Sequence, residues 1–463
     1  MSKTRDELNP LSELFAVSTS RTYKNLAFGW SELRGRLELE AMEAAFRVTV
    51  DRFPRMMSGV KQIWSRGRFS LVWEFRPHLK PALNIHNLSA GEPNIETWND
   101  IYERLESLLE RGPDPFNGVT TEFHLVRISA ERHIIAVILH HCAGDAIYSS
   151  FFPTLLANYH KAITKELPSW AAGQIAFFGE KKNSRPIEEH PPTVVPFREK
   201  WFPWPKPGEF GHIAGSGSND DHRQYCRRTT FSEDQTRRIV EAARALRTTS
   251  IDYLTACVHL TVERWNNAMN QETGILSTAH SINLSARRKD LSDTNTLGQI
   301  FLQTTPDQRA SPSSTLRLLQ ASRLTQQRNS SAELFHDAIR RGRMLAGPFP
   351  LDVKRSLGYF LLHTLQWGVA AAQINYFGVA FPKSVDGRPT GESFVHRGHE
   401  LEMTDIFLLA YKTFPRAPIQ MWIYTYRNRL SLVLAARGRQ FTADEVESFT
   451  NLLAECLLEY PLD

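Results

Sequence analysis

A histidine and an aspartate that follow an apolar run are the residues with the clearest chemical potential. Residues 140–146 read HHCAGDA, which places His141 four positions before Asp145, and no other His-x-x-x-Asp occurs in the chain. An imidazole with an ordinary pKa of about 6.5 can take a proton from a hydroxyl or an amine near neutral pH. The aspartate could orient that imidazole, as in a catalytic triad, or it could be a buried charge that requires a cationic partner.

The residues beside His141, namely His140 and Cys142, raise two alternatives, a thiol nucleophile and a metal site. A Cys142–His141 pair would suggest a thiol nucleophile, but adjacent residues at a strand end point to opposite sides. We therefore expect Cys142 to be a small buried side chain and His140 to pack on the opposite face. A metal site needs three or more converging ligands, and the nearest further candidates, His396 and His399, lie far along the chain. We expect no bound metal and no resident cofactor.

A strand and a helix are predicted to hold this motif. Residues 133–140 (HIIAVILH) form a β-branched apolar run of strand length. Residues 147–163 carry apolar side chains at helical spacing, with Pro153 placed in the first turns. A side chain at a strand-to-loop-to-helix junction can be presented in a cleft.

A proline-rich stretch divides the chain. Seven prolines lie within residues 186–207, and such a stretch cannot be a regular helix or a central strand. We predict an α/β protein with an N-terminal subdomain at 1–180, a crossover linker at 181–225 and a C-terminal subdomain at 226–463. In the second half, the patterns predict helices over 232–246 and 251–265, strands over 274–284 and 429–437, and a final helix capped by Thr442 and Glu445.

Composition excludes several classes of protein. The chain has 463 residues, of which 41% are hydrophobic and 23% charged, so it can bury a large core. A net charge of +5 is too weak to indicate nucleic-acid binding. The four cysteines have no CxxC spacing, the N-terminus is polar, and no run of 18 apolar residues occurs. We expect a cytoplasmic monomer without a membrane span.

Residues 119–160, which contain HHCAGDA, resemble the central signature of the CoA-dependent acyltransferase superfamily, HHxxxDG at the end of a strand. That superfamily includes chloramphenicol acetyltransferase, the plant BAHD acyltransferases, the trichothecene O-acetyltransferases, the carnitine acyltransferases and the condensation domains of nonribosomal peptide synthetases. Residues 33–57, 281–300 and 374–382 resemble further family segments in the same order. The chain departs from the family at Ala146, at Gln299, and over residues 378–380, where the BAHD segment DFGWG is absent.

The resemblance implies a fold and a set of site residues. The fold would consist of two chloramphenicol-acetyltransferase-like subdomains, each a mixed sheet flanked by helices, with an active-site tunnel between them. His141 would be the general base. Asp145 would point away from it and pair with Arg287 of the other half, with Arg288 as the competing partner or both arginines forming a solvated basic patch. Asn283 and Asn375 match positions near the substrate channel, although either could equally cap a strand end. Gly144, which has no side chain, would let the backbone approach a substrate closely or would be a turn residue.

The resemblance also implies an activity. The leading interpretation is transfer of an acyl group from acyl-CoA to a hydroxyl of a small secondary metabolite, without a covalent acyl-enzyme. A second interpretation is a free-standing condensation-type enzyme that takes its acyl group from a phosphopantetheine thioester on an acyl carrier protein and forms an ester or an amide with an alcohol or an amine. A third is an inactive, binding-only member, against which the intact His141 and Asp145 argue.

Overall fold

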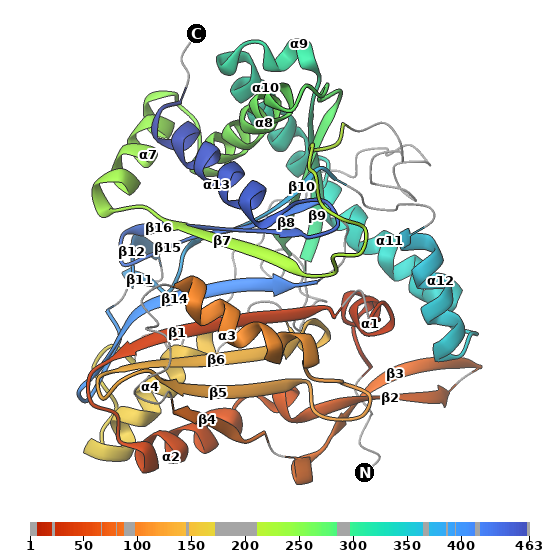
Figure 1. The fold of residues 1–463 in the computed structure, drawn as a ribbon. Coiled ribbons are helices and arrows are strands. Elements are labelled where there is room, and N and C mark those ends of the chain that lie inside the picture. Colours follow the sequence, from red (N-terminus) through yellow and green to blue (C-terminus); the bar gives the residue numbers. More distant parts are fainter. Residues whose placement is uncertain are drawn as a thin grey trace.

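Two six-stranded sheets organise the chain (Figure 1). The computed structural model describes residues 7–20, 24–65, 67–79, 81–87, 98–144, 148–171, 211–284, 297–363, 370–385, 388–393, 395–412 and 417–460. Helices pack against both sheets, which gives the mixed α/β architecture of two sheet-based subdomains that the sequence predicts.

The first sheet carries the strand that leads to His141. Its strand order is β13-β14-β1-β6-β5-β4. These strands are β13 (Arg397–Gly398), β14 (Leu401–Tyr411), β1 (Leu26–Arg34), β6 (Arg132–His140), β5 (Thr121–Arg127) and β4 (Leu83–Asn87). Strand β6 pairs antiparallel with both β1 and β5, and its residues from His133 to His140 are all buried. The strand predicted over 133–140 is confirmed at the centre of this sheet.

Helices and a hairpin complete the first half. Helix α4, predicted from its apolar spacing, is confirmed with Pro153 inside it, and it packs beside α2. The hairpin β2–β3 extends to one side of the sheet and lies near the end of α12 (Figure 1). These elements are α1 (Pro10–Val17), α2 (Leu39–Val50), η1 (Pro54–Met57), β2 (Ser58–Ser65), β3 (Arg68–Phe75), η2 (Pro77–Leu79), α3 (Trp98–Arg111) and α4 (Tyr148–Thr164).

The second sheet has the strand order β7-β16-β15-β10-β8-β9. Its strands are β7 (Gln224–Thr230), β16 (Arg429–Arg437), β15 (Ile419–Tyr426), β10 (Ala372–Val379), β8 (Leu276–Asn283) and β9 (Leu297–Thr304), and β11 (Pro382–Val385) pairs with β12 (Arg388–Ser393) separately. Its helices are α7 (Glu233–Ala245), α8 (Ser250–Ala268), α9 (Pro306–Arg309), α10 (Pro312–Arg328), α11 (Ser331–Ala346), α12 (Leu351–His363) and α13 (Ala443–Leu458). The predicted capping boxes at Ser232 and Thr442 are both formed.

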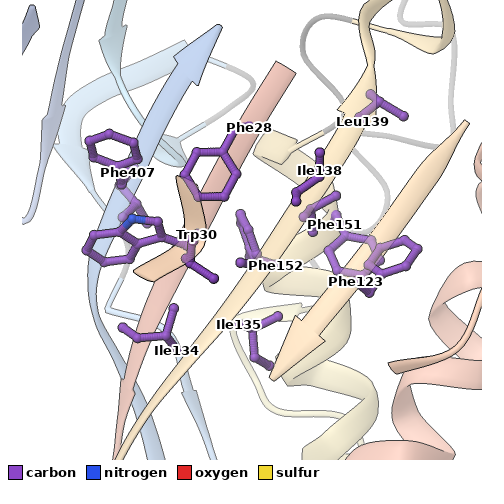
Figure 2. Close-up of a cluster of buried hydrophobic side chains, with 14 of the residues drawn as sticks. Phe28, Trp30, Phe123, Ile134, Ile135, Ile138, Leu139, Phe151, Phe152 and Phe407 are labelled. Carbon is purple, nitrogen blue, oxygen red and sulfur yellow. The ribbon is translucent and has the colours of Figure 1, made fainter. Parts of the chain in front are cut away.

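An aromatic core stabilises the first sheet. Trp30 of β1 stacks on Phe407 of β14 with ring centroids 5.4 Å apart, and Phe123 of β5 stacks on Phe151 of α4 at 5.0 Å. Figure 2 shows these rings around β1, β5 and β6. Since each aromatic side chain removes a large apolar area from water, this cluster fixes the strand that ends at His140.

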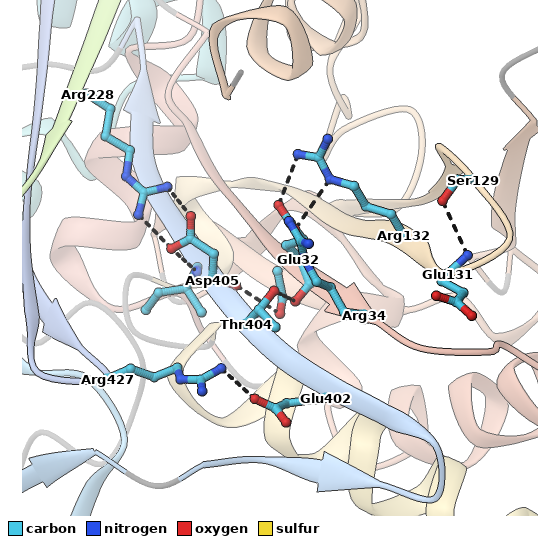
Figure 3. A network of polar contacts seen from close by, with 12 residues as sticks. Glu32, Arg34, Ser129, Glu131, Arg132, Arg228, Glu402, Thr404, Asp405 and Arg427 are labelled. Carbon is cyan, nitrogen blue, oxygen red and sulfur yellow. Dashed lines mark hydrogen bonds and ion pairs between the residues drawn. The ribbon is translucent and has the colours of Figure 1, made fainter. Parts of the chain in front are cut away.

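The second half of the chain contributes two strands to the first sheet. Strand β14 pairs antiparallel with β1 over the whole length of β1, and β13 extends that edge. Arg228 of β7 then joins the two sheets, because its guanidinium donates to both carboxylate oxygens of Asp405 on β14 at 2.6 Å each (Figure 3). The first sheet therefore contains strands from both sides of the proline-rich stretch, and the ion pair of Arg228 with Asp405 joins it to the second sheet. The boundaries 1–180, 181–225 and 226–463 remain a prediction, and residues 172–210, which include the proline-rich stretch, lie outside the described part.

Candidate active site

His141 lies in a tight turn directly after β6. Residues His141–Ala143 form the 3-10 turn η3, and the His141 main-chain N–H donates to the carbonyl oxygen of Asn25 at 2.7 Å. Gly144 closes the turn by donating to the His141 carbonyl at 3.3 Å. Cys142 and Ala143 are fully buried, whereas His141 is half-buried. Within η3, the imidazole is thus the side chain that keeps access to solvent.

Helix α1 covers this turn. The ring of Phe15 stacks on the imidazole of His141 with centroids 4.1 Å apart and planes inclined by 21°. Cys142 belongs to a buried apolar cluster built mainly from α1 and the β2–β3 hairpin. Three side chains from the second half of the chain pack against that cluster, namely Leu297, Ile339 and Leu351. The turn therefore lies where the two halves meet.

His140 has a structural role behind the turn. Its Nδ1 accepts a hydrogen bond from the Cys142 main-chain N–H at 3.2 Å, so in the neutral ring Nε2 carries the proton and donates to the Thr19 hydroxyl at 2.8 Å. Burial, with a smaller contribution from His141, lowers the pKa of His140 to about 3. His140 is therefore neutral at pH 7, and both ring nitrogens support the loop that holds His141.

Cys142 is a poor nucleophile in this setting. Its side chain is completely buried, and burial raises the pKa of the thiol well above its ordinary value. Since the thiolate is the reactive form, a protonated thiol packed in an apolar cluster has little nucleophilic character.

The other predicted site residues fall on three elements. Gly144 ends the turn, Asn283 is the exposed last residue of β8, and Asn375 lies half-buried on β10. The Asn375 side chain bonds within the second sheet, because its carbonyl oxygen accepts from the Ser281 hydroxyl at 2.8 Å and its amide donates to the Met421 carbonyl at 3.3 Å.

Some predicted site residues cannot be placed. Asp145, Arg287 and Arg288 lie outside the described residues, so the proposed ion pair between the two halves stays a prediction.

Sequence reasoning missed α1, which brings Phe15 to the site. The signal was present, because Asn9 is followed by Pro10, a typical helix start. In the structure the Asn9 side chain accepts a hydrogen bond from the Ser12 N–H at 2.8 Å, and Pro10 begins the helix. The stack on His141 has no signal in the sequence, because it joins residues that are distant along the chain.

The described residues show neither a metal-binding cluster nor a helix that could cross a membrane. They contain no group of three or more histidine, cysteine, aspartate or glutamate side chains that could hold a metal ion. In the same part of the chain, no helix combines the length and the hydropathy that a membrane crossing requires.

Comparison with known proteins identifies the fold. No protein-family model and no curated protein matches the sequence. Among solved structures, the first condensation domain of the calcium-dependent antibiotic synthetase, in complex with a substrate analogue, superposes with a TM-score of 0.67 at 14% identity, covering 100% of this chain and 98% of that one. Trichothecene 15-O-acetyltransferase from Fusarium sporotrichioides gives a TM-score of 0.65 at 12% identity, with 99% and 95% covered.

A third similar structure is the starter condensation domain of rhizomide synthetase in complex with C8-CoA, with a TM-score of 0.64, 11% identity, and 98% and 94% of the two chains covered. These proteins share the chloramphenicol-acetyltransferase-like fold. The chain therefore has the two-sheet fold of these condensation domains and of this acetyltransferase, as predicted.

Proposed function

We propose that the chain is an acyltransferase that moves an acyl group from acyl-CoA to a hydroxyl of a small molecule, with His141 as the general base. The observation that carries the proposal is the position of His141, which lies half-buried at the end of β6 where the two halves meet, within this fold. The similarity to an acetyltransferase and to a domain solved in complex with C8-CoA supports a thioester donor.

The proposed reaction is a direct transfer. His141 takes the hydroxyl proton as the acceptor oxygen attacks the thioester carbonyl, and the carbon–sulfur bond then breaks. The leaving thiolate takes that proton back from the imidazolium. No acyl-enzyme is required, because the donor is already activated and both substrates are held together. Gly144, Asn283 and Asn375 are proposed to line the substrate path, and Asp145 is proposed to hold the loop by pairing with Arg287.

A carrier-bound donor is the second candidate. The condensation domains among the similar structures favour it, because the one solved in complex with a substrate analogue superposes over 98% of its length on this chain. The two donors can be separated by comparing octanoyl-CoA with an octanoyl-phosphopantetheinyl carrier protein as donor for the same panel of alcohols and amines. A much higher kcat/KM with the carrier would replace the first proposal with the second.

Substitution of the base tests the chemistry itself. With acetyl-CoA or octanoyl-CoA and the best acceptor from that panel, His141→Ala should lower kcat by about 10²- to 10⁴-fold while the protein stays folded. His222→Ala is the matched control, since His222 is exposed in the second half, and it should retain wild-type activity. Near-wild-type turnover in His141→Ala would remove His141 from the mechanism. A wild type that binds acyl-CoA without turnover would favour the binding-only interpretation.

A further inference from the structure

The plane of the His141 ring requires a contact that the main chain cannot supply. The hydrogen bond from the His141 N–H to the Asn25 carbonyl fixes the backbone of the turn. Rotation about the last side-chain torsion of a histidine is soft, so a hydrogen bond of the backbone does not by itself set the plane of the ring. The face of Phe15 lies against the imidazole at 4.1 Å and nearly parallel to it. This stack restricts the plane in which the imidazole nitrogens lie.

Phe15 is itself tied to the turn by hydrogen bonds. Its carbonyl oxygen, at the end of α1, accepts from the Thr19 hydroxyl at 2.8 Å and from the Asn25 side-chain amide at 3.1 Å. The Thr19 hydroxyl in turn accepts a hydrogen bond from His140 Nε2, and the Asn25 carbonyl oxygen accepts one from the His141 main-chain N–H. Hydrogen bonds thus join the end of α1 to His140 and to the turn η3, and the Phe15 ring faces His141.

The same helix is clamped by the second half of the chain. The Glu13 carboxylate, 5% exposed, accepts from Lys354 Nζ of α12 at 2.8 Å and from Arg343 Nε of α11 at 2.7 Å. Lys354 is 4% exposed and also donates to the Phe69 carbonyl at 2.9 Å. Because a buried carboxylate requires its cations, the position of α1 depends on α11 and α12.

We infer that Phe15 is a positioning residue that sets the plane of the His141 imidazole, and that the clamp at Glu13 makes this alignment depend on the docking of the second half. The inference rests on the proposed function, because a general base must aim its lone pair at the acceptor hydroxyl. A base whose plane is not fixed loses rate without losing affinity for the donor. The role of Phe15 is therefore visible in kcat rather than in KM.

Three substitutions in α1 test the role of Phe15. Phe15→Leu keeps apolar volume but removes the flat face, and it should lower kcat by about 10- to 100-fold with KM for octanoyl-CoA within about twofold. Phe15→Tyr keeps the face and should restore kcat to within about threefold of the wild type. Leu11→Ala is the control, because Leu11 lies in the same helix and cluster, so this variant loses packing but keeps the stack. It should lower the melting temperature while kcat at low temperature stays near wild type.

A spectroscopic measurement separates this inference from the proposed function. In protein with labelled histidines, the ring proton signals of His141, assigned by their loss in His141→Ala, should be displaced by the stacked Phe15 ring and should move in Phe15→Leu but not in Leu11→Ala. Should Phe15→Leu fail to fold, Phe15→Met removes the ring with a more adaptable side chain.

The possible outcomes are distinct. Unmoved His141 signals, or an unchanged kcat in a folded Phe15→Leu variant, would overturn the positioning role. A wild type without acyl transfer to any acceptor in the panel would overturn the proposed function instead, and the displaced signals would still show whether Phe15 fixes the ring.

Discussion

Two charged contacts differ in what they join and in their surroundings: one joins the two sheets, and the other joins the two halves of the chain. Arg228 and Asp405 connect strands of the two sheets beside the aromatic core of the first sheet, where the Arg228 guanidinium lies 5.9 Å from the ring of Trp30. Tyr424 and Tyr426 of the second sheet add hydrogen bonds from their hydroxyls to carbonyls of β14 at 2.9 and 3.0 Å. Strand pairing and buried rings thus fix this contact, which we call the sheet contact.

The other contact, here called the helix contact, consists of Glu13, Arg343 and Lys354. It joins helices, and close to it the last turn of α11 carries Met344 and Leu345, which are 68% and 69% exposed. The small apolar cluster beside it includes Phe15 and Cys142 at the candidate site. The comparison indicates that the sheet contact holds the fold together, whereas the helix contact adjusts the geometry around His141.

The sheet contact should carry the largest effect on stability. Arg228→Met removes three hydrogen bonds of a buried guanidinium, two to Asp405 and one to the Ser431 hydroxyl. Because the Asp405 side chain is 32% exposed and regains water, the total cost should be about 3–5 kcal/mol rather than the full sum of three charged hydrogen bonds. The free energy of unfolding, measured in urea, should fall by that amount, while kcat measured on the folded protein stays within about threefold of the wild type. Loss of activity without loss of stability would show that the sheet contact also governs the site.

For the helix contact we expect a smaller effect on stability and a larger effect on kcat than for the sheet contact. Lys354→Met removes the hydrogen bonds from Lys354 to Glu13 and to the Phe69 carbonyl, but Glu13 keeps Arg343 as its partner, so the cost in stability should be about 1–3 kcal/mol. Because α1 is then held less firmly, kcat should fall by about 3- to 10-fold. Arg237→Ala removes an exposed pair with Asp234 and is the control in which neither quantity changes. Equal kcat in Lys354→Met and the wild type would mean that α1 does not need its clamp.

Local features of the sequence predicted the elements on which the site rests. The β-branched run before His141 predicted β6, and the pairs Ser232–Gln235 and Thr442–Glu445 predicted two helix starts, because capping depends on neighbours three residues apart. The insertion of β14 beside β1 could not be predicted in this way. Strand order depends on which faces bury each other in the folded chain, and alternation along a single strand does not contain that information.

The same limit applies to the site. The position of His141 after β6 followed from the motif and its strand, but the Phe15 stack and the buried Glu13 depend on contacts between distant segments. A buried glutamate is chemically indistinguishable from a surface one in the sequence, and only the approach of Lys354 and Arg343 explains it.

Acid should weaken both regions through buried histidines. His396 packs on Phe381 and Tyr426 beside the sheet contact, and burial lowers its pKa to about 3, as it does for His140. An unfolded histidine titrates at about 6.5, so between these values the unfolded chain binds protons that the folded chain excludes. Stability is fully present above about pH 6.5 and should fall with decreasing pH by about 1.4 kcal/mol per unit for each histidine.

Replacing His396 measures how much this one histidine contributes to the loss of stability at low pH. His396→Phe, which suits its aromatic neighbours, should reduce the slope of unfolding free energy against pH by about 1.4 kcal/mol per unit between pH 6 and 4. The kcat at pH 7 should stay unchanged, since His396 lies beside the sheet contact. An unaltered slope would mean that His396 is already protonated in the folded protein.

The smallest expected effect concerns Cys142, which belongs to the apolar cluster beside the helix contact. Because burial keeps its thiol protonated, incubation with acetyl-CoA alone should leave the protein mass unchanged, and initial rates with both substrates varied should give intersecting lines. Cys142→Ala removes one sulfur from the cluster and should keep kcat within about threefold of the wild type. A stable acyl adduct on Cys142, with parallel initial-rate lines, would show that the Cys142 sulfur attacks the donor first and that the acceptor reacts only with the acyl-enzyme. The helix contact would then hold a nucleophile in place, and the direct transfer proposed here would be wrong.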